Sequence, residues 1–245
     1  MYKIAIIILL IINTLNGQNV KIYGDKNYPP YSYLENGKNK GIYVEVVEKA
    51  FKKMKGFNVV IELGLWGDVF TKVKKGRGVG IFPPFYKKER ESILIYSEPL
   101  VQEQVVVFGT TRKLKGKTKW PEDFYDQNIG VNSGFGYDSM GGKAFLKAYN
   151  DGKLEISESR NNKLNLEKVN SNRLDFYIND KLIDISDYPK IKRGPVAVSN
   201  YGYLCFTKNI ERYKFIPKFK KQFDYIIQEM KDNGEIEDII KKYIK

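Results

Sequence analysis

The sequence predicts an α/β fold built around a mostly parallel sheet. Three short apolar runs, at 20–23, 57–63 and 79–82, have the length and composition of strands. Between them lie two segments, 43–54 and 66–75, whose apolar residues recur at helical spacing. A strand–helix–strand–helix–strand order of this kind implies parallel strands joined by right-handed crossovers.

A second α/β series follows a polar, basic connector at 109–119, which is a candidate domain boundary. A strand at 104–108 leads into this connector. Beyond it, we expect alternating strands and helices at 128–131, 138–149, 154–157, 164–169 and 174–178. A run at 195–206 has the pattern of a strand that crosses between domains, and two amphipathic helices, 216–230 and 236–243, close the chain.

The first eighteen residues have the pattern of a signal peptide. Lys3 supplies the positive charge, an apolar run covers 4–12, and 13–17 forms a polar exit. The apolar run is too short to span a bilayer as a mature helix, so we expect cleavage near Gly17 or Gln18. The mature protein is then expected to be exported and soluble; a retained membrane anchor is the alternative.

Histidine is absent from the chain and cysteine occurs once, at position 205. These counts exclude an intramolecular disulfide, histidine-based catalytic triads and the usual zinc sites. Cys205 lies in an apolar, strand-like run, where a buried thiol acts as a small hydrophobic group. We therefore predict neither a metal nor a cofactor.

The 245-residue chain carries a formal net charge of +13. Such an excess suits nucleic acid or an anionic membrane surface. The lysines, however, are spread along predicted helices together with Glu and Asp, which is typical of solvated helix faces. No nucleic-acid motif accompanies the aromatic content of 14%. We therefore expect no nucleic-acid partner, and a charge that attracts anionic ligands or surfaces only in a general way.

The stretch 79–100 places an arginine at the end of a strand. Pro83 and Pro84 end the strand, because proline donates no hydrogen bond to a sheet. Arg90 then lies in a loop at a carboxyl strand end, where open α/β sheets bind their ligands. A planar guanidinium suits a carboxylate or a phosphate. The alternative is that Arg90 pairs with Glu89 or Glu91 on the surface.

Several segments taken in order and spacing carry a family resemblance: 28–33, 41–45, 89–90, 96–100, 129–134, 172–175 with Asp180, and 232–236. The chain resembles the type II periplasmic solute-binding proteins, in the branch known as solute-binding protein family 3. Members of this branch typically bind polar amino acids for ABC importers. The resemblance covers nearly the whole mature chain.

The resemblance implies a two-lobed type II periplasmic-binding-protein fold. Each lobe is a mostly parallel sheet flanked by helices, and two crossing hinge strands join the lobes. The implied division is 19–108 with 201–245 for lobe one, and 109–200 for lobe two. Closure of the lobes around a small-molecule ligand would be read by a membrane partner, the permease of an ABC importer or a membrane sensor.

The resemblance also assigns site residues. Arg90 matches the arginine that grips the α-carboxylate of the ligand, and Asp180 matches the acid that receives its α-ammonium group. Tyr28 and Trp66 match aromatic positions that stack on the ligand side chain. The alternatives are that Asp180 caps a short helix after the strand 174–178, and that the two aromatics belong to the core.

The chain departs from the family pattern around the pocket. Family members place small hydroxyl residues before the arginine, where this chain has Pro83, Phe85 and Lys87. In lobe two the hydroxyl-rich turn is replaced by Phe135-Gly136-Tyr137. These changes suggest a flatter cleft with aromatic walls: Phe85, Tyr86, Phe135 and Tyr137.

We therefore predict a non-enzymatic, monomeric binding protein for a small, polar, carboxylate-bearing solute, an amino acid or a related molecule. An enzyme on the same fold is one alternative, because some relatives are dehydratases acting on cyclic carboxylates with a cleft acid as catalyst. Glu98, Glu103 or Asp180 could supply that acid. A sensory ligand-binding module is the other alternative.

Overall fold

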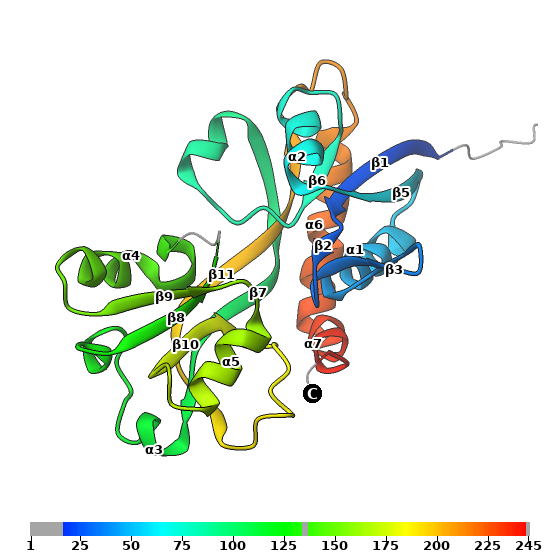
Figure 1. The fold of residues 1–245 in the computed structure, drawn as a ribbon. Coiled ribbons are helices and arrows are strands. Elements are labelled where there is room, and N and C mark those ends of the chain that lie inside the picture. The colour runs from blue at the N-terminus through cyan, green and yellow to red at the C-terminus, as the bar shows by residue number, and fades with distance from the viewer. Residues whose placement is uncertain (1–16, 134–136, 244–245) are drawn as a thin grey trace, which may run out of the picture.

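The computed structural model describes residues 17–133 and 137–243 (Figure 1). The segment 1–16, which holds nearly all of the predicted signal peptide, lies outside the described residues. The strands are β1 Gln18–Asp25, β2 Asn27–Tyr28, β3 Ser32–Glu35, β4 Lys38–Lys40, β5 Phe57–Gly64, β6 Gly80–Phe82, β7 Leu94–Thr110, β8 Asn128–Asn132, β9 Glu155–Ser159, β10 Phe176–Asp180 and β11 Ile191–Thr207. The helices are α1 Ile42–Lys53, α2 Trp66–Lys74, α3 Thr111–Leu114, α4 Tyr137–Asn150, α5 Asn162–Asn170, α6 Ile216–Asp232 and α7 Glu235–Lys241, with 3₁₀ turns at Lys88–Ser92 and Glu122–Phe124.

The main sheet runs in the order β5-β1-β6-β11-β7-β10-β8-β9. Strand β1 is parallel to β5 and β6, and β8 is parallel to β9 and β10. Strands β7 and β11 pair with each other in antiparallel fashion between these two parallel groups. The predicted α/β class with its mostly parallel sheet is confirmed.

Strands β7 and β11 are 17 residues long and cross from one parallel group to the other. From the sequence, the apolar run 93–96 is expected to end at Ser97-Glu98-Pro99, but β7 continues through Pro99. Proline lacks the N–H that the ladder needs, and β11 accommodates it with a shift of register at Tyr203, the partner of Pro99. The predicted strand at 104–108 is therefore the far end of one continuous strand.

The first unit of the molecule consists of β1 to β6 with α1, α2, α6 and α7. Its sheet is buried on both faces. Ile22 of β1 packs in a core with residues of α1, α6 and α7, while its neighbour Tyr23 packs against α2. Cys205 is buried on the α2 side as a free thiol, as the sequence predicts.

The second unit consists of β8 to β10 with α3, α4 and α5. The far end of β7 alternates between its two cores. Val105 and Val107 pack with residues of α4, whereas Val106 and Phe108 pack with residues of α5. Successive strand side chains point to opposite faces, so a strand buried on both faces is apolar throughout. Residues 105–108 thus pack with the second unit.

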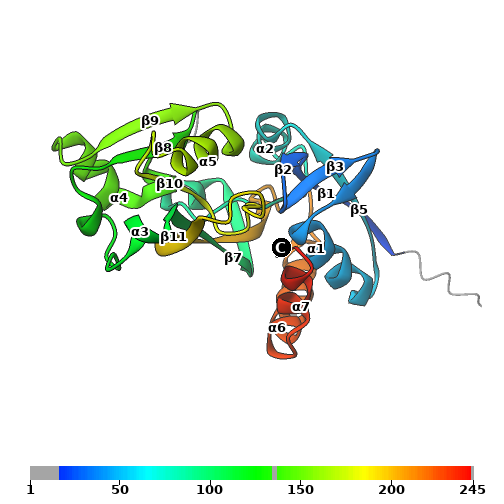
Figure 2. The same cartoon turned by 60° about the horizontal axis from the view of Figure 1, so that its bottom comes forward.

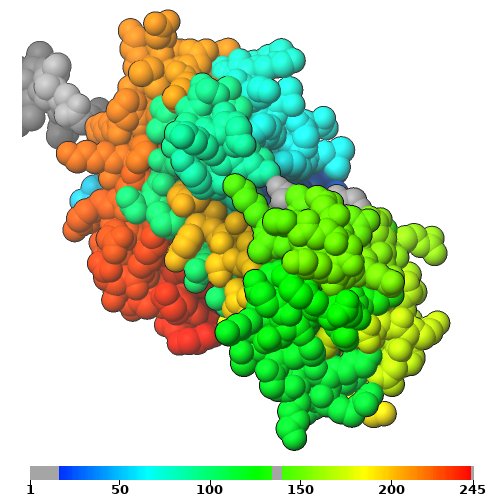
Figure 3. Space-filling view, turned by 90° about the vertical axis from the view of Figure 1, so that its left-hand side faces the viewer, coloured from blue at the N-terminus to red at the C-terminus, as the bar shows by residue number. Residues whose placement is uncertain are grey.

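The two units lie at opposite ends of the crossing strands. Figure 2 shows the first unit, with α6 and α7, on one side and the second unit, with α3 and α4, on the other. In Figure 3 the gold segment of β11 reaches the surface between the green residues of the second unit and the orange and teal residues around the first unit. The crossing strands therefore connect the two units.

A small antiparallel sheet of β2, β3 and β4 lies beside β1 in the first unit (Figure 1). From the sequence, a proline-locked aromatic loop is expected over 25–33; the structure forms β2 within this segment and begins β3 at its end. Ser32 is fully buried, and its hydroxyl donates to the carbonyl of Asp25. This hydrogen bond joins the end of the loop to the end of β1. It fixes the position of Tyr28 and Tyr31, which lie in the chain between Asp25 and Ser32.

Packing at the crossing makes one testable prediction about stability. A methyl group on Gly202 of β11 would overlap the hydroxyl of Tyr43, a fully buried side chain, and would lie 2.9 Å from Pro83. Gly202→Ala is therefore expected to cost about 1–3 kcal/mol in the free energy of unfolding, measured by thermal unfolding.

The matched control is Gly67→Ala in α2, where an added methyl group meets no atom within 4 Å. This variant is expected to unfold at or slightly above the wild-type temperature, because alanine favours helix over glycine. Equal stability of the two variants would contradict the described packing at the crossing.

Candidate functional site

Two tyrosines of the first unit reach toward the crossing strands. The rings of Tyr28 and Tyr31 stack with centroids 5.2 Å apart, and Tyr31 is only 2% exposed. The Tyr31 hydroxyl donates to Oδ2 of Asp180, at the end of β10 in the second unit, over 2.7 Å. This hydrogen bond joins the two units directly.

Asp180 lies at the carboxyl end of β10, where the family resemblance places a ligand-binding acid. Its Oδ1 accepts from the N–H of Leu182 at 2.7 Å, and the following residues form a turn. The alternative that Asp180 caps a helix is therefore wrong. Burial raises the pKa of the Asp180 carboxyl above its ordinary value.

Glu103, in the middle of β7, is the second acid at this position. Its side chain is only 4% exposed and accepts hydrogen bonds from the hydroxyls of Tyr28 and Tyr43. Burial raises the pKa of Glu103 to about 8, and the nearby charge of Asp180 acts in the same direction. Burial therefore favours the protonated form of Glu103, against the hydrogen bonds from Tyr28 and Tyr43, which favour the carboxylate.

Sequence reasoning considered Glu103 only as an acid for the enzyme alternative and missed its position in the site. A signal was present. Val101, Glu103 and Val105 share one face of a strand, because side chains alternate with period two. An acid in that alternation, between two buried valines, indicates a buried carboxyl group.

Arg90 lies in the 3₁₀ turn Lys88–Ser92, after the end of β6. Its Nη1 donates to the carbonyl of Phe85 at 3.0 Å, and its guanidinium lies 5.2 Å from the ring centre of Phe70. Among the described residues, no carboxylate pairs with Arg90. The alternative of a surface pair with Glu89 or Glu91 is therefore not observed.

Trp66 and Phe85 lie beside this arginine. Trp66, at the start of α2, packs against Phe70 with ring centres 5.5 Å apart, so tryptophan, phenylalanine and guanidinium form one layered group. The backbone of Phe85 forms an isolated bridge with Gly202 of β11. Trp66 thus reaches Arg90 through the ring of Phe70, whereas Phe85 contacts both Arg90 and the crossing strand β11.

Two groups therefore flank the crossing: a buried acid–tyrosine cluster and an arginine–aromatic group. In the described part of the chain, neither a hydrogen bond nor an ion pair joins Arg90 to Asp180. Phe135 lies outside the described residues. Tyr137 is the first residue of α4, so the structure places its backbone.

The described residues contain no group of three or more acidic, histidine or cysteine side chains placed to hold a metal ion. The chemical groups of the site are instead hydroxyls, two buried carboxyls, one guanidinium and aromatic faces. Such a set can bind a small polar molecule by charge, hydrogen bonds and stacking.

Residues 20–245 match the model of the bacterial extracellular solute-binding proteins, family 3. The chain belongs to this family. Its members bind small ligands and deliver them to the permeases of ABC importers, and the chain has this solute-binding role. The prediction from sequence is confirmed at this level.

Solved structures share the fold. The second substrate-binding domain of GlnP from Lactococcus lactis, in an open conformation, is 15% identical with a TM-score of 0.72, covering 93% of this chain and 95% of that one. The L-cystine solute receptor of Neisseria gonorrhoeae, unliganded and open, is 18% identical with a TM-score of 0.70 and 94% coverage of both chains. These likenesses confirm the two-lobed type II periplasmic binding fold, which is the fold of substrate-binding proteins.

A sensor domain has the same fold. The sensor domain of a histidine kinase, described as similar to periplasmic binding proteins, is 16% identical with a TM-score of 0.63, covering 93% of this chain and 96% of that one. Curated proteins give no match to the chain. Within 17–133 and 137–243, the helices are too short or too polar to cross a membrane.

The raised pKa of Glu103 predicts a pH-dependent stability. The pKa in the unfolded chain is near the ordinary 4.5, and the folded value is about 8. The folded state therefore binds the proton more tightly, and the stabilisation is lost as the pH rises from about 4.5 to about 8. Glu103→Gln removes this titration. The difference in unfolding temperature between Glu103→Gln and wild type should therefore move steadily in favour of the variant up to about pH 8 and then level off.

The control for this experiment is Glu98→Gln, which changes an exposed glutamate on the same strand. Its difference from wild type should stay nearly constant with pH. A constant difference for Glu103→Gln over the same range would contradict a protonated, buried Glu103.

Proposed function

We propose that the chain captures a small, polar, carboxylate-bearing solute, an amino acid or a related molecule, between its two units. The observation that carries this proposal is the meeting of polar groups from both units at the crossing strands. Tyr31 of the first unit contacts Asp180 of the second, next to Glu103 on β7. A ligand that contacts both units there would favour their closed arrangement.

Arg90 is the proposed partner of the ligand carboxylate. Its guanidinium is held in place by the Phe85 carbonyl and the Phe70 ring, and its remaining donors have no carboxylate partner among the described residues. A planar group fixed in this way is organised for a two-pronged bond to a carboxylate.

Asp180 is the proposed partner of the ammonium group. Its pKa is raised by burial, and a cation beside it would restore the charged form. Tyr28, Trp66, Phe85, Phe135 and Tyr137 are the proposed aromatic walls. Pro83 and Lys87 replace the family's small hydroxyl residues, so stacking has a larger part in ligand recognition.

The proposal also covers the division into two lobes and the cellular location of the protein. Lobe one is 19–108 with 201–245 and lobe two is 109–200; packing favours placing 105–108 with lobe two. The protein is exported to the periplasm by the segment 1–18, acts as a monomer and releases its ligand chemically unchanged to a membrane permease.

The test is a thermal-shift screen of amino acids, small peptides, dicarboxylates and cyclic acids. A ligand present at a hundred times its dissociation constant adds about 2.7 kcal/mol to the free energy of unfolding. For a protein of this size the shift is roughly 5–10 °C. Arg90→Ala is expected to weaken binding of any hit by at least about thirtyfold, because a charge-assisted pair is lost.

Arg77→Ala is the matched control. It removes the same charge from an exposed arginine of the first unit and should leave the shift unchanged. A hit that binds Arg90→Ala as tightly as wild type would overturn the proposed role of Arg90 while leaving the solute-binding role intact.

Two other functions have a specific observation in their favour. The similar fold of a histidine kinase sensor domain favours a sensory module, which would pass closure to a membrane receptor instead of a permease. The buried Glu103, with its raised pKa, favours an acid catalyst for a cyclic-acid dehydratase. Incubation of a hit with the protein and analysis of the solution for product separates this enzyme from a binding protein.

A further inference from the structure

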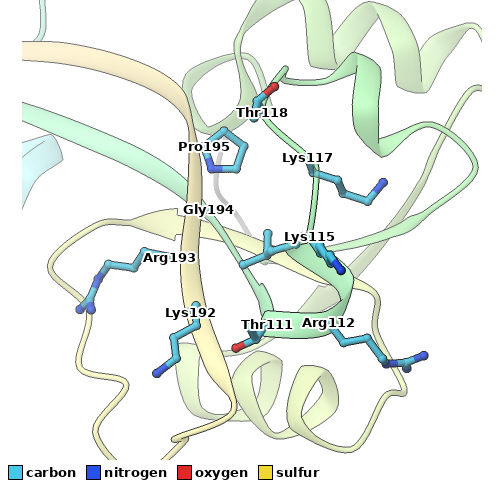
Figure 4. A pocket seen from close by; sticks show the side chains of 10 residues that line it. Thr111, Arg112, Lys115, Lys117, Thr118, Lys192, Arg193, Gly194 and Pro195 are labelled. Atoms are coloured by element: carbon cyan, nitrogen blue, oxygen red, sulfur yellow. The ribbon is translucent and has the colours of Figure 1, made fainter.

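A groove separate from the candidate site lies at the end of the second unit. It occupies about 840 Å³ between α3, with the segment that follows it, and the start of β11 (Figure 4). Its lining is mainly basic: Thr111, Arg112, Leu114, Lys115, Lys117, Thr118, Lys192, Arg193, Gly194 and Pro195. Figure 1 places α3 at the bottom of the second unit, away from the first.

The sequence around the groove is exceptionally one-sided in charge. Residues 109–119 contain five lysines and arginines and no acid, and 190–193 adds three more basic residues. The basic residues of 109–119 and 190–193 do not belong to solvated faces of long helices. They lie in a short helix, a connector and the start of a strand. The fold brings them together around one groove.

Some of these cations are already engaged. Arg193 donates to the carbonyls of Lys181 and Ile183, and Lys117 donates to the carbonyl of Asp123. Lys113 forms an ion pair with Asp175. The bonds of these three side chains stabilise the backbone segments that form the groove.

Three other cations are exposed: Arg112, Lys115 and Lys192. Within the described residues they form no ion pair. Asp123, which follows this basic segment, is engaged elsewhere, because its carboxylate accepts from the N–H groups of Thr118 and Lys119. The unpaired cations thus face outward over a lining that contains no acid.

We propose that this groove is a docking surface for an anionic phospholipid membrane. Basic side chains on flexible stems, spread over one end of a domain, suit a plane of phosphate groups, which needs no fixed geometry. Phosphate oxygens can also accept hydrogen bonds from the hydroxyls of Thr111 and Thr118. The lining has no aromatic side chain for stacking on bases, which disfavours single-stranded nucleic acid as the occupant.

This surface would hold the second unit at the membrane without covering the middle of the crossing strands, where the candidate site lies. None of the ten lining residues belongs to the acid–tyrosine cluster or to the arginine–aromatic group. Binding of solute and binding of membrane are then separable properties.

The test is sedimentation of the full 245-residue chain with vesicles of phosphatidylcholine alone or with about one third phosphatidylglycerol. Wild type should bind the anionic vesicles more tightly, and high salt should abolish the difference, because screening acts within about 3 Å at 1 M salt. Each basic residue near an anionic surface contributes roughly fivefold in affinity. The triple variant Arg112→Gln, Lys115→Gln, Lys192→Gln should therefore bind about a hundredfold more weakly.

The matched control is Lys52→Gln, Lys218→Gln, Lys221→Gln, which removes three exposed charges from the first unit. All variants carry the same apolar N-terminal segment, 1–18. Binding to vesicles of phosphatidylcholine alone therefore measures how much this segment contributes to vesicle binding. The control should keep most of the wild-type affinity. Equal losses in the two triple variants, or no preference for anionic vesicles, would overturn the proposal.

Discussion

The antiparallel pairing of β7 with β11 is the constraint on which the rest of the structure depends. Both units use these strands as part of their own sheets, and each unit buries its share of them on both faces. The middle of the pair, near 101–104 and 199–202, lies between the stretches that pair with β6 and with β10, and Val101 and Glu103 pack there against the first unit.

The sequence predicts much of this fold, because strands buried on both faces and amphipathic helices leave strong local patterns. Continuity through Pro99 could not be predicted, since it depends on a shift of register in a partner strand a hundred residues later. The same is true of the short strands within 25–33, which are fixed by a buried bond from Ser32. In both places, contacts with residues far away in the chain determine where a strand forms.

For the site, the family resemblance identifies Arg90 and Asp180 as candidate ligand-binding residues. It does not predict which side chains surround them. The hydroxyls that reach Glu103 come from Tyr28 and Tyr43, far away in the chain. The basic groove is likewise formed by segments that lie far apart in the chain, since its two walls are separated by about eighty residues in sequence. The distribution of charge therefore becomes visible only in the folded molecule: buried acids at the centre and unpaired cations at one end.

The bond from Tyr31 to Asp180 has a consequence for how tightly a solute can be held. The hydroxyl of Tyr31 donates to the same carboxylate that the proposed ammonium group would contact. Tyr31 is then an internal competitor, and the affinity measured for a solute is the difference between two alternative contacts.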